Sequence, residues 1–280
     1  MFERDRAPEE LPAFAAAVEE MGADDLWVVE DLGWAGSISA TAMALAATRS
    51  LRVGIGIAPV ALRNPALLAM ELATLTRVHP GRVVAGVGHG VPEWMRQVGA
   101  ETVHKLALLE ETTVAVRGLL AGETVTLKGR TVDIDGVTLV HPPAEVPPIV
   151  TGVVRPRSLE LSGRVADGTI LAEGNGPAEI EAALIHINRG RESSTRPAHE
   201  LIVFAYLHID GDPEATREIV NSQAEWLGVP AESLFTFIGP AETIPAKLAA
   251  LRAAGADTVV LRPRGPDPES QARRALAQLA

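Results

Sequence analysis

Short runs of apolar residues alternate with helical segments along almost all 280 residues, and this alternation limits the possible folds more than any other feature. Seven runs have the length and the branched residues of buried strands. They cover residues 26–29, 51–58, 82–87, 149–152, 168–172, 201–209 and 258–261. Helical spacing predicts helices at 8–21, 39–48, 65–78, 102–120, 158–165, 178–189, 213–227 and 241–254, and a last one from residue 268.

Strands that are apolar on both faces are typical of a parallel sheet covered by its crossover helices. The stub before Pro8 can supply an eighth strand, and eight strand–helix units in this length fit a (β/α)8 TIM barrel. A doubly wound α/β sheet is the alternative, and it would leave the first and last strands apart. The count favours a single barrel domain over residues 1–280 with a truncated first strand.

One stretch, residues 123–140, departs from this rhythm. β-branched residues alternate there around Gly129 and Gly136, which predicts a short antiparallel hairpin. We interpret it as an insertion into the barrel and not as a second domain.

The composition excludes several classes of protein. A net charge of -11 argues against binding to nucleic acid or to an anionic membrane, because phosphates would be repelled. The chain has no cysteine, which excludes disulfides, thiol catalysis and iron–sulfur clusters. No apolar run approaches the roughly 20 residues of a membrane span, and the charged start is unlike a signal peptide. We expect a soluble cytoplasmic protein.

The active site of such a barrel is expected where its strands end. No lysine stands at these ends, so Schiff-base chemistry is disfavoured. The chain also lacks paired metal-binding histidines and a Gly-x-Ser-x-Gly nucleophile motif, so neither a metal site nor a serine hydrolase is predicted. Catalysis by a Schiff base, by a bound metal or by a serine nucleophile is therefore disfavoured, and the activity has to rest on other groups.

Glycines gather at two of the strand ends, as Gly54, Gly56, Gly86, Gly88 and Gly90. Glycine lets a backbone approach something flat or large, although small residues here can also serve barrel packing alone. A third strand end, residues 151–158, runs into a helix and carries Arg155 and Arg157. Free N–H groups, the helix dipole and two cations predict an anion site, with an ordinary helix start as the alternative.

Four segments, taken in order, resemble the bacterial luciferase-like family of flavin- and F420-dependent oxidoreductases. They are residues 63–68 with 80–82 (RNPALL and PGR), residues 85–90 (AGVGHG), residues 155–168 (RPRSLELSGRVADG), and residues 238–242 with 254–257 (IGPAE and AGAD). The resemblance spans nearly the whole chain, and residues 158–168 are its most specific part.

This resemblance implies a (β/α)8 barrel that binds FMN or coenzyme F420 at the strand ends and forms a homodimer. If the segment before Pro8 is counted as the first strand, the ring would lie on the third strand, residues 51–58. In the family a non-prolyl cis peptide often lies beside the ring, here within residues 55–58 with Gly56 as the expected participant. The phosphate would lie where the helix near Arg155 begins. The cofactor-binding residues implied are Gly56, Ile57, Ala58, Gly88, His89, Thr151, Gly152, Val153, Arg155 and Arg157.

The chain departs from the family at positions that matter for proton transfer. Where the family commonly has a histidine after the strand at residues 26–29, this chain has Leu32. Where the family often has a glutamate after the strand at residues 82–87, it has Val91. Many FMN monooxygenases of the family have arginine where His89 stands, which favours F420 here.

His89, Asp31 and Glu30 are the remaining candidates for proton transfer, because histidine titrates near neutrality and carboxylates can act as acids or bases. The alternatives are a structural hydrogen bond for His89 and helix capping for the two carboxylates. Trp34 and Trp94 flank the same mouth, where they wall the substrate pocket or pack in a core or interface.

We therefore expect an oxidoreductase that transfers a hydride between F420 or FMN and a small organic molecule. One alternative is an FMN-dependent luciferase-type monooxygenase, supplied with reduced flavin by a partner reductase. The other is a non-catalytic barrel that only binds the flavin or deazaflavin.

Overall fold

The computed structural model describes residues 1–265 and 267–279, and its centre is a parallel sheet of short strands. Neighbouring strands pair in the order β1 (Asp25–Val28), β2 (Arg52–Ile55), β4 (Val83–Gly88), β7 (Ile149–Gly152), β8 (Gly168–Leu171), β9 (Glu200–Ile209) and β11 (Thr258–Pro263). Every one of these pairs is parallel, as the apolar strands predict.

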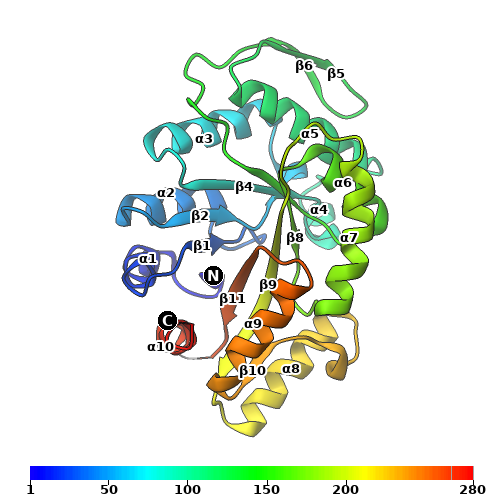
Figure 1. Ribbon diagram of the computed structural model, residues 1–280. Helices are drawn as coiled ribbons and strands as arrows, with labels where there is room; N and C mark the ends of the chain where they lie inside the picture. The colour runs from blue at the N-terminus through cyan, green and yellow to red at the C-terminus, as the bar shows by residue number, and fades with distance from the viewer. Residues whose placement is uncertain (266, 280) are drawn as a thin grey trace.

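The helices lie outside the sheet and connect its strands (Figure 1). They are α1 (Leu11–Glu20), α2 (Ser37–Ala47), α3 (Pro65–Val78), α4 (Pro92–Gln97), α5 (Lys105–Leu120), α6 (Pro156–Val165), α7 (Pro177–Arg191), α8 (Pro213–Leu227), α9 (Ile244–Ala253) and α10 (Pro268–Leu276). All but α4 were predicted from the sequence. In the described part of the chain, no helix has the length and apolarity needed to cross a membrane.

The first residues of the chain close the ring of strands. The backbone N–H of Phe2 donates to the carbonyl of Trp27 in β1 (2.9 Å), and the amino group of Met1 donates to the carbonyl of Leu261 in β11 (2.8 Å). Figure 1 shows the N-terminus between β1 and β11. The barrel prediction is thus confirmed and the doubly wound alternative is wrong, although residues 1–6 link β1 to β11 by these two hydrogen bonds and form no strand of their own.

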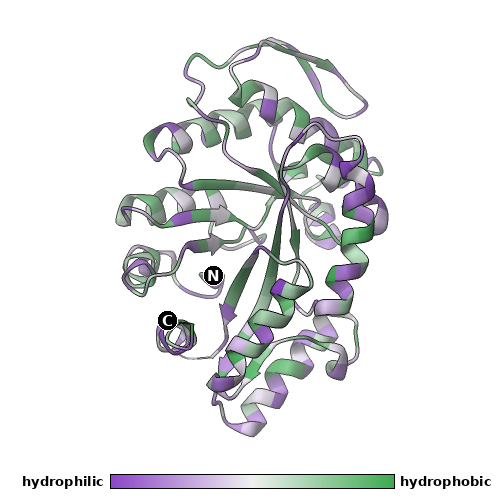
Figure 2. Cartoon of the chain, in the orientation of Figure 1, coloured by the Kyte–Doolittle hydropathy of each residue, from purple (hydrophilic) through white to green (hydrophobic). Residues whose placement is uncertain are grey.

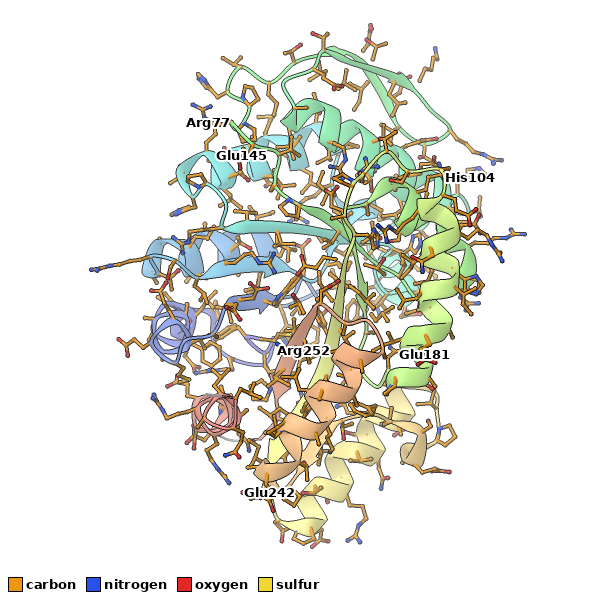
Figure 3. The ribbon with its side chains drawn as sticks, in the orientation of Figure 1. Arg77, His104, Glu145, Glu181, Glu242 and Arg252 are labelled. Carbon is orange, nitrogen blue, oxygen red and sulfur yellow. The ribbon has the colours of Figure 1, made fainter. Side chains whose placement is uncertain are left out.

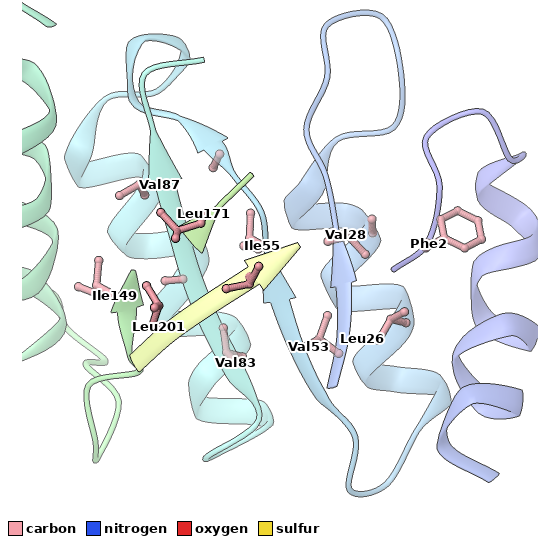
Figure 4. Packing of buried hydrophobic residues seen from close by; sticks show 14 of the residues in the cluster. Phe2, Leu26, Val28, Val53, Ile55, Val83, Val87, Ile149, Leu171 and Leu201 are labelled. Carbon is pink, nitrogen blue, oxygen red and sulfur yellow. The ribbon is translucent and has the colours of Figure 1, made fainter. Parts of the chain in front are cut away.

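Alternate residues of each strand face the barrel interior and the helices, so the core has two layers. Leu26, Val28, Val53, Ile55 and Val87 belong to the layer between the strands and the helices, part of which is drawn in Figure 4. A separate cluster fills the barrel with Trp27, Val84, Val150, Ile170, Ile202, Phe204 and Val260. Figure 2 shows the strands largely in green and most purple residues on the helices and loops.

The predicted insertion is a hairpin of β5 (Val125–Lys128) and β6 (Asp133–Val137), which pair antiparallel. It lies at one end of the molecule, above α5 in Figure 1. The Glu111 carboxylate of α5 accepts hydrogen bonds from the backbone N–H groups of Arg130, Thr131 and Val132 at 2.7–2.9 Å. This carboxylate therefore ties the hairpin to the barrel.

The sequence-based strand at residues 51–58 is two strands in the structure. β2 ends at Ile55, and β3 (Ala58–Pro59) pairs with β4 after an interruption at residues 56 and 57. The peptide bond between Gly56 and Ile57 is cis. A further short strand, β10 (Phe237–Gly239), pairs with the end of β9 and was not predicted.

Candidate functional site

A small apolar surface lies where β2, β4 and β7 end, and we call it the shelf. It consists of Gly56, Ile57, Gly88 and Gly152, and Gly88 pairs with Gly152 between neighbouring strands. A Cβ on Gly152 would lie 2.7 Å from Cγ2 of Ile57, and a Cβ on Gly88 would lie 3.0 Å from Cγ1 of Ile57. The two glycines therefore make room for the Ile57 side chain, and the expected cis peptide is confirmed at Gly56–Ile57.

Gly54, Gly56 and Gly86 are explained by packing within the protein. A Cβ on Gly54 would lie 2.5 Å from the Trp27 ring, and a Cβ on Gly56 would lie 2.6 Å from the Phe204 ring. A side chain on Gly86 would collide with the carbonyl of Ile55. These contacts agree with the packing alternative for the three glycines, and Ile57 is the partly exposed apolar side chain of the shelf.

The start of α6 lies next to the shelf, because β7 leads into it. The buried hydroxyl of Thr151 donates to Ser162 of α6 (2.6 Å) and ties the strand end to the helix. Val153 is buried as well. Arg155 and Arg157 are exposed, and the guanidinium group of neither forms a hydrogen bond or ion pair with any residue that the structure describes. Two unengaged cations at the positive end of a helix can bind an anion.

His89 follows β4 directly after Gly88 of the shelf, and its ring approaches α6. Its Nε2 lies 3.3 Å from the hydroxyl of Ser158 in α6, and its Nδ1 is buried without a partner among the described residues. Burial lowers the pKa of His89, and the Lys105 ammonium lowers it further. The ring is therefore neutral at pH 7 and can still form a hydrogen bond at Nδ1.

Glu30 and Asp31, adjacent in sequence, have different surroundings. Glu30 is paired with Arg63 and accepts a hydrogen bond from the backbone N–H of Ser37 (3.0 Å), at the start of α2. Both of its oxygens are engaged, which agrees with the capping alternative. Asp31 is paired with Arg4 at 2.7 Å.

The two predicted tryptophans lie together at the mouth. The centroids of Trp34 and Trp94 are 6.3 Å apart, and the Arg4 guanidinium lies 4.5 Å from the Trp34 centroid. Because Arg4 also binds Asp31, the structure brings Asp31, Trp34 and Trp94 together and leaves Glu30 outside this group.

A cleft of about 280 Å³ opens between the hairpin and the segment that follows the shelf. It is lined by residues 60–65, Ala100, Leu108 and residues 131–133. Val60 and Ala61 also line a smaller hollow beside His89. The insertion thus forms one wall of a cleft on the His89 side of the site.

On the opposite side of the mouth is a group of charged residues that the sequence analysis did not select. We call it the ion-pair network, and it consists of Glu3, Glu173, Arg262 and Arg264. Arg262 of β11 donates to both carboxylate oxygens of Glu3 (2.9 and 2.8 Å) and is also paired with Glu173. Nη1 of Arg264 lies 2.9 Å from Oε2 of Glu3.

The central members of the network are buried. The side chains of Glu3, Glu173 and Arg262 are only 9%, 10% and 15% exposed. Burial alone would lower the pKa of Arg262, but Glu173 and Glu3 outweigh it and raise that pKa. Glu173 and Arg262 stand at strand ends, which was the available signal, but their pairing with Glu3 could not be foreseen.

Comparison with known proteins places these features in a family. A model of the luciferase-like monooxygenases matches residues 3–244. The chain is 29% identical over 204 residues to a 5,10-methylenetetrahydromethanopterin reductase of Methanolobus tindarius, a match covering 73% of this chain and 62% of the relative. It is 29% identical over 239 residues to an F420-dependent glucose-6-phosphate dehydrogenase of Nakamurella multipartita, covering 77% and 68%. The chain thus spans less than two thirds of the methanopterin reductase.

Solved structures share the fold at low sequence identity. The coenzyme F420 dependent tetrahydromethanopterin reductase of Methanopyrus kandleri superposes with a TM-score of 0.84 at 19% identity, covering 98% of this chain and 95% of that one. The oxygenating constituent of 3,6-diketocamphane monooxygenase from Pseudomonas putida, in complex with FMN, gives 0.77 at 16% identity, covering 100% and 95%. The resemblance noted in the sequence is confirmed, and the relatives include users of both expected cofactors.

Proposed function

The chain belongs to the luciferase-like monooxygenase family, and from this premise we propose that it is an oxidoreductase that transfers a hydride between F420 or FMN and an organic substrate. The observation that carries the proposal is the position of the shelf directly beside two unengaged arginines. An apolar surface for a ring and cations for a phosphate are what either cofactor requires. F420 is preferred because the relatives matched in sequence include F420-dependent dehydrogenases.

The residues present fit such a group. Ile57 offers an apolar surface, Arg155 and Arg157 offer charge for a phosphate, and the buried Nδ1 of His89 lacks a partner among the described residues. When bound, the ring supplies the site that gives or accepts a hydride. The protein's part is to hold that ring against Ile57 and to keep its phosphate at α6.

Proton transfer is assigned to His89 first. Its neutral ring can hold or release a proton at Nδ1, and the residue directly follows Gly88 of the shelf. Asp31 is a weaker candidate because Arg4 binds it, and we assign Glu30 to holding α2 because both of its oxygens are engaged. Trp34 and Trp94 would form the wall of the substrate pocket.

An FMN-dependent monooxygenase is the second candidate, favoured by the fold shared with the FMN-bound camphane enzyme. It would require a partner reductase. A homodimer is also proposed, supported by the exposed apolar residues Leu67, Met70 and Val78 of α3. The cytoplasmic location and the single domain over residues 1–280 stay predictions.

Titration of the purified protein with F420 and, separately, with FMN tests the proposal by the change in cofactor absorbance. We expect saturable binding of F420 at micromolar concentrations. Saturation by FMN alone would favour the monooxygenase, and binding without turnover over a substrate panel would favour the non-catalytic barrel. Binding of neither cofactor would overturn the proposal.

A further inference from the structure

Tyr206, the only tyrosine of the chain, lies on the interior face of β9. Two residues earlier, Phe204 packs against Gly56 of the shelf. Because side chains two apart share one face of a strand, Tyr206 lies on that face one level nearer the mouth. Its partner in the neighbouring strand is Arg262, whose guanidinium lies 5.4 Å from the Tyr206 ring centroid.

The hydroxyl of Tyr206 is an unused hydrogen-bonding group. The residue is only 2% exposed, yet its hydroxyl has no hydrogen bond to any described residue. Its oxygen also keeps some contact with solvent, unlike the fully buried unpaired polar atoms of the described residues. A nearly buried polar group usually has a partner, so this one is free for a ligand that enters the mouth.

The cations around Tyr206 are already neutralised. Arg262 and Arg264 are paired with Glu3 and Glu173, and Arg4 at the rim is paired with Asp31. An anionic ligand would have to displace a buried carboxylate or lie beside it, and both are costly. An uncharged oxygen needs only a hydrogen bond.

Burial raises the pKa of Tyr206, and the Glu173 carboxylate raises it further. The hydroxyl therefore stays protonated throughout the neutral range and can donate a hydrogen bond to a carbonyl or alcohol oxygen.

The geometry points to Tyr206 as the group that binds the substrate's oxygen, and to an uncharged alcohol or carbonyl compound as the substrate, in place of a phosphate or carboxylate. This assignment rests on the proposed function, since it places the substrate across the mouth from the shelf. Glu3, Glu173 and Arg262 act as positioning residues that hold Tyr206 and remove the site's affinity for anions.

The single tyrosine allows a direct test. Full-length protein labelled with 3-fluorotyrosine has one fluorine, at residue 206, so its fluorine NMR resonance reports on this residue alone. We would titrate it with benzyl alcohol and with benzoate, which share a ring and differ in charge. We expect a saturable shift with benzyl alcohol and binding of benzoate at least about tenfold weaker. Equal or tighter binding of benzoate, or no shift with the alcohol, would overturn the assignment.

A variant pair tests the role of the network. Glu173→Gln leaves Arg262 and Arg264 with one carboxylate between them, so benzoate should bind more tightly than to the wild-type chain. Glu181→Gln, on the outer surface of α7 (Figure 3), is the matched control and should leave the preference unchanged. Unchanged benzoate binding in a folded Glu173→Gln protein would contradict the role of the network. If that variant does not fold, the wild-type comparison of the two probes decides.

Both titrations are made on the cofactor-free and on the F420-loaded protein. Binding of neither F420 nor FMN, with the alcohol preference intact, removes the proposed function and leaves Tyr206 as a site for neutral oxygens. If F420 binds but benzyl alcohol is not preferred over benzoate, the role assigned to Tyr206 is wrong and the proposed function stands.

Discussion

The two sides of the barrel mouth are built on opposite principles. On the shelf, side chains are removed at Gly88 and Gly152 so that one apolar residue, Ile57, covers the strand ends. Across the mouth, the ion-pair network consists of largely buried charges that hold one another in place. The first side suits a flat, uncharged ring, and the second presents a single free hydroxyl. The proposed function and the role proposed for Tyr206 thus divide cofactor binding and substrate recognition between the two halves of one barrel.

Removing one member of the ion-pair network should lower the free energy of unfolding more than any other change proposed here. Arg262→Met leaves Glu3 and Glu173 buried with less compensation, and removing one member of a buried pair costs about 3–5 kcal/mol of the free energy of unfolding. Urea unfolding measures it. As control, Arg96→Gln removes an exposed ion pair with Glu93 and should change stability by about 0.5 kcal/mol or less. Equal losses of unfolding free energy in Arg262→Met and Arg96→Gln would mean that the buried ion pairs contribute no more to stability than an exposed one.

Filling the shelf should have the next largest effect. Gly152→Val places atoms where Ile57 lies, so we expect a loss of about 1–3 kcal/mol in stability and a still clearer loss of F420 affinity. Thermal unfolding and cofactor titration measure the two effects. Gly36→Ala, where no atom lies within 4 Å of the new Cβ, is the control. Full F420 affinity in Gly152→Val would show that the ring does not rest on Ile57.

Acid should destabilise the hydrogen-bonded residues that hold the end of β7 against α6. Hydrogen bonds link Thr151 to Ser162, Ser162 to Thr169, and Thr169 to His199 at 2.6–2.8 Å. Burial, with a smaller contribution from Arg191, lowers the pKa of His199 from 6.5 to about 4. The unfolded chain therefore binds a proton that the folded chain resists, and stability falls as the pH drops from 6.5 towards 4.

Urea unfolding across this pH range tests that contribution. In His199→Asn the decline should be shallower, because the titrating group has been removed. His186→Asn, on the outer part of α7, is the matched control and should retain the wild-type slope. A wild-type slope in His199→Asn would contradict the assignment.

The arginines at α6 should have the smallest effect in free energy. Both are exposed, so Arg155→Ala with Arg157→Ala should weaken F420 binding by about three- to tenfold and should leave stability unchanged. Their effect should shrink as salt is added, because exposed charges are screened. The control is Arg189→Ala with Arg191→Ala on α7. An equal loss from both double variants would mean that no phosphate lies at α6.

The shelf could be largely predicted from the sequence, and the ion-pair network could not. Closely spaced glycines at strand ends are a local signal, and together with the family resemblance they placed the cis peptide correctly. They did not reveal that Trp27 and Phe204 occupy the space beside Gly54 and Gly56. The network joins residues 3, 173 and 262, which only closure of the barrel brings together. Likewise, no pattern in the sequence shows that Arg63 and Ser37 engage both oxygens of Glu30.

A crystal structure of the protein with F420 bound tests the division into two halves most directly. We expect the ring against Ile57, the phosphate beside Arg155 and Arg157, and the Tyr206 hydroxyl across the mouth from the shelf. A ring bound in the cleft beside the hairpin, or a phosphate held by the ion-pair network, would contradict it.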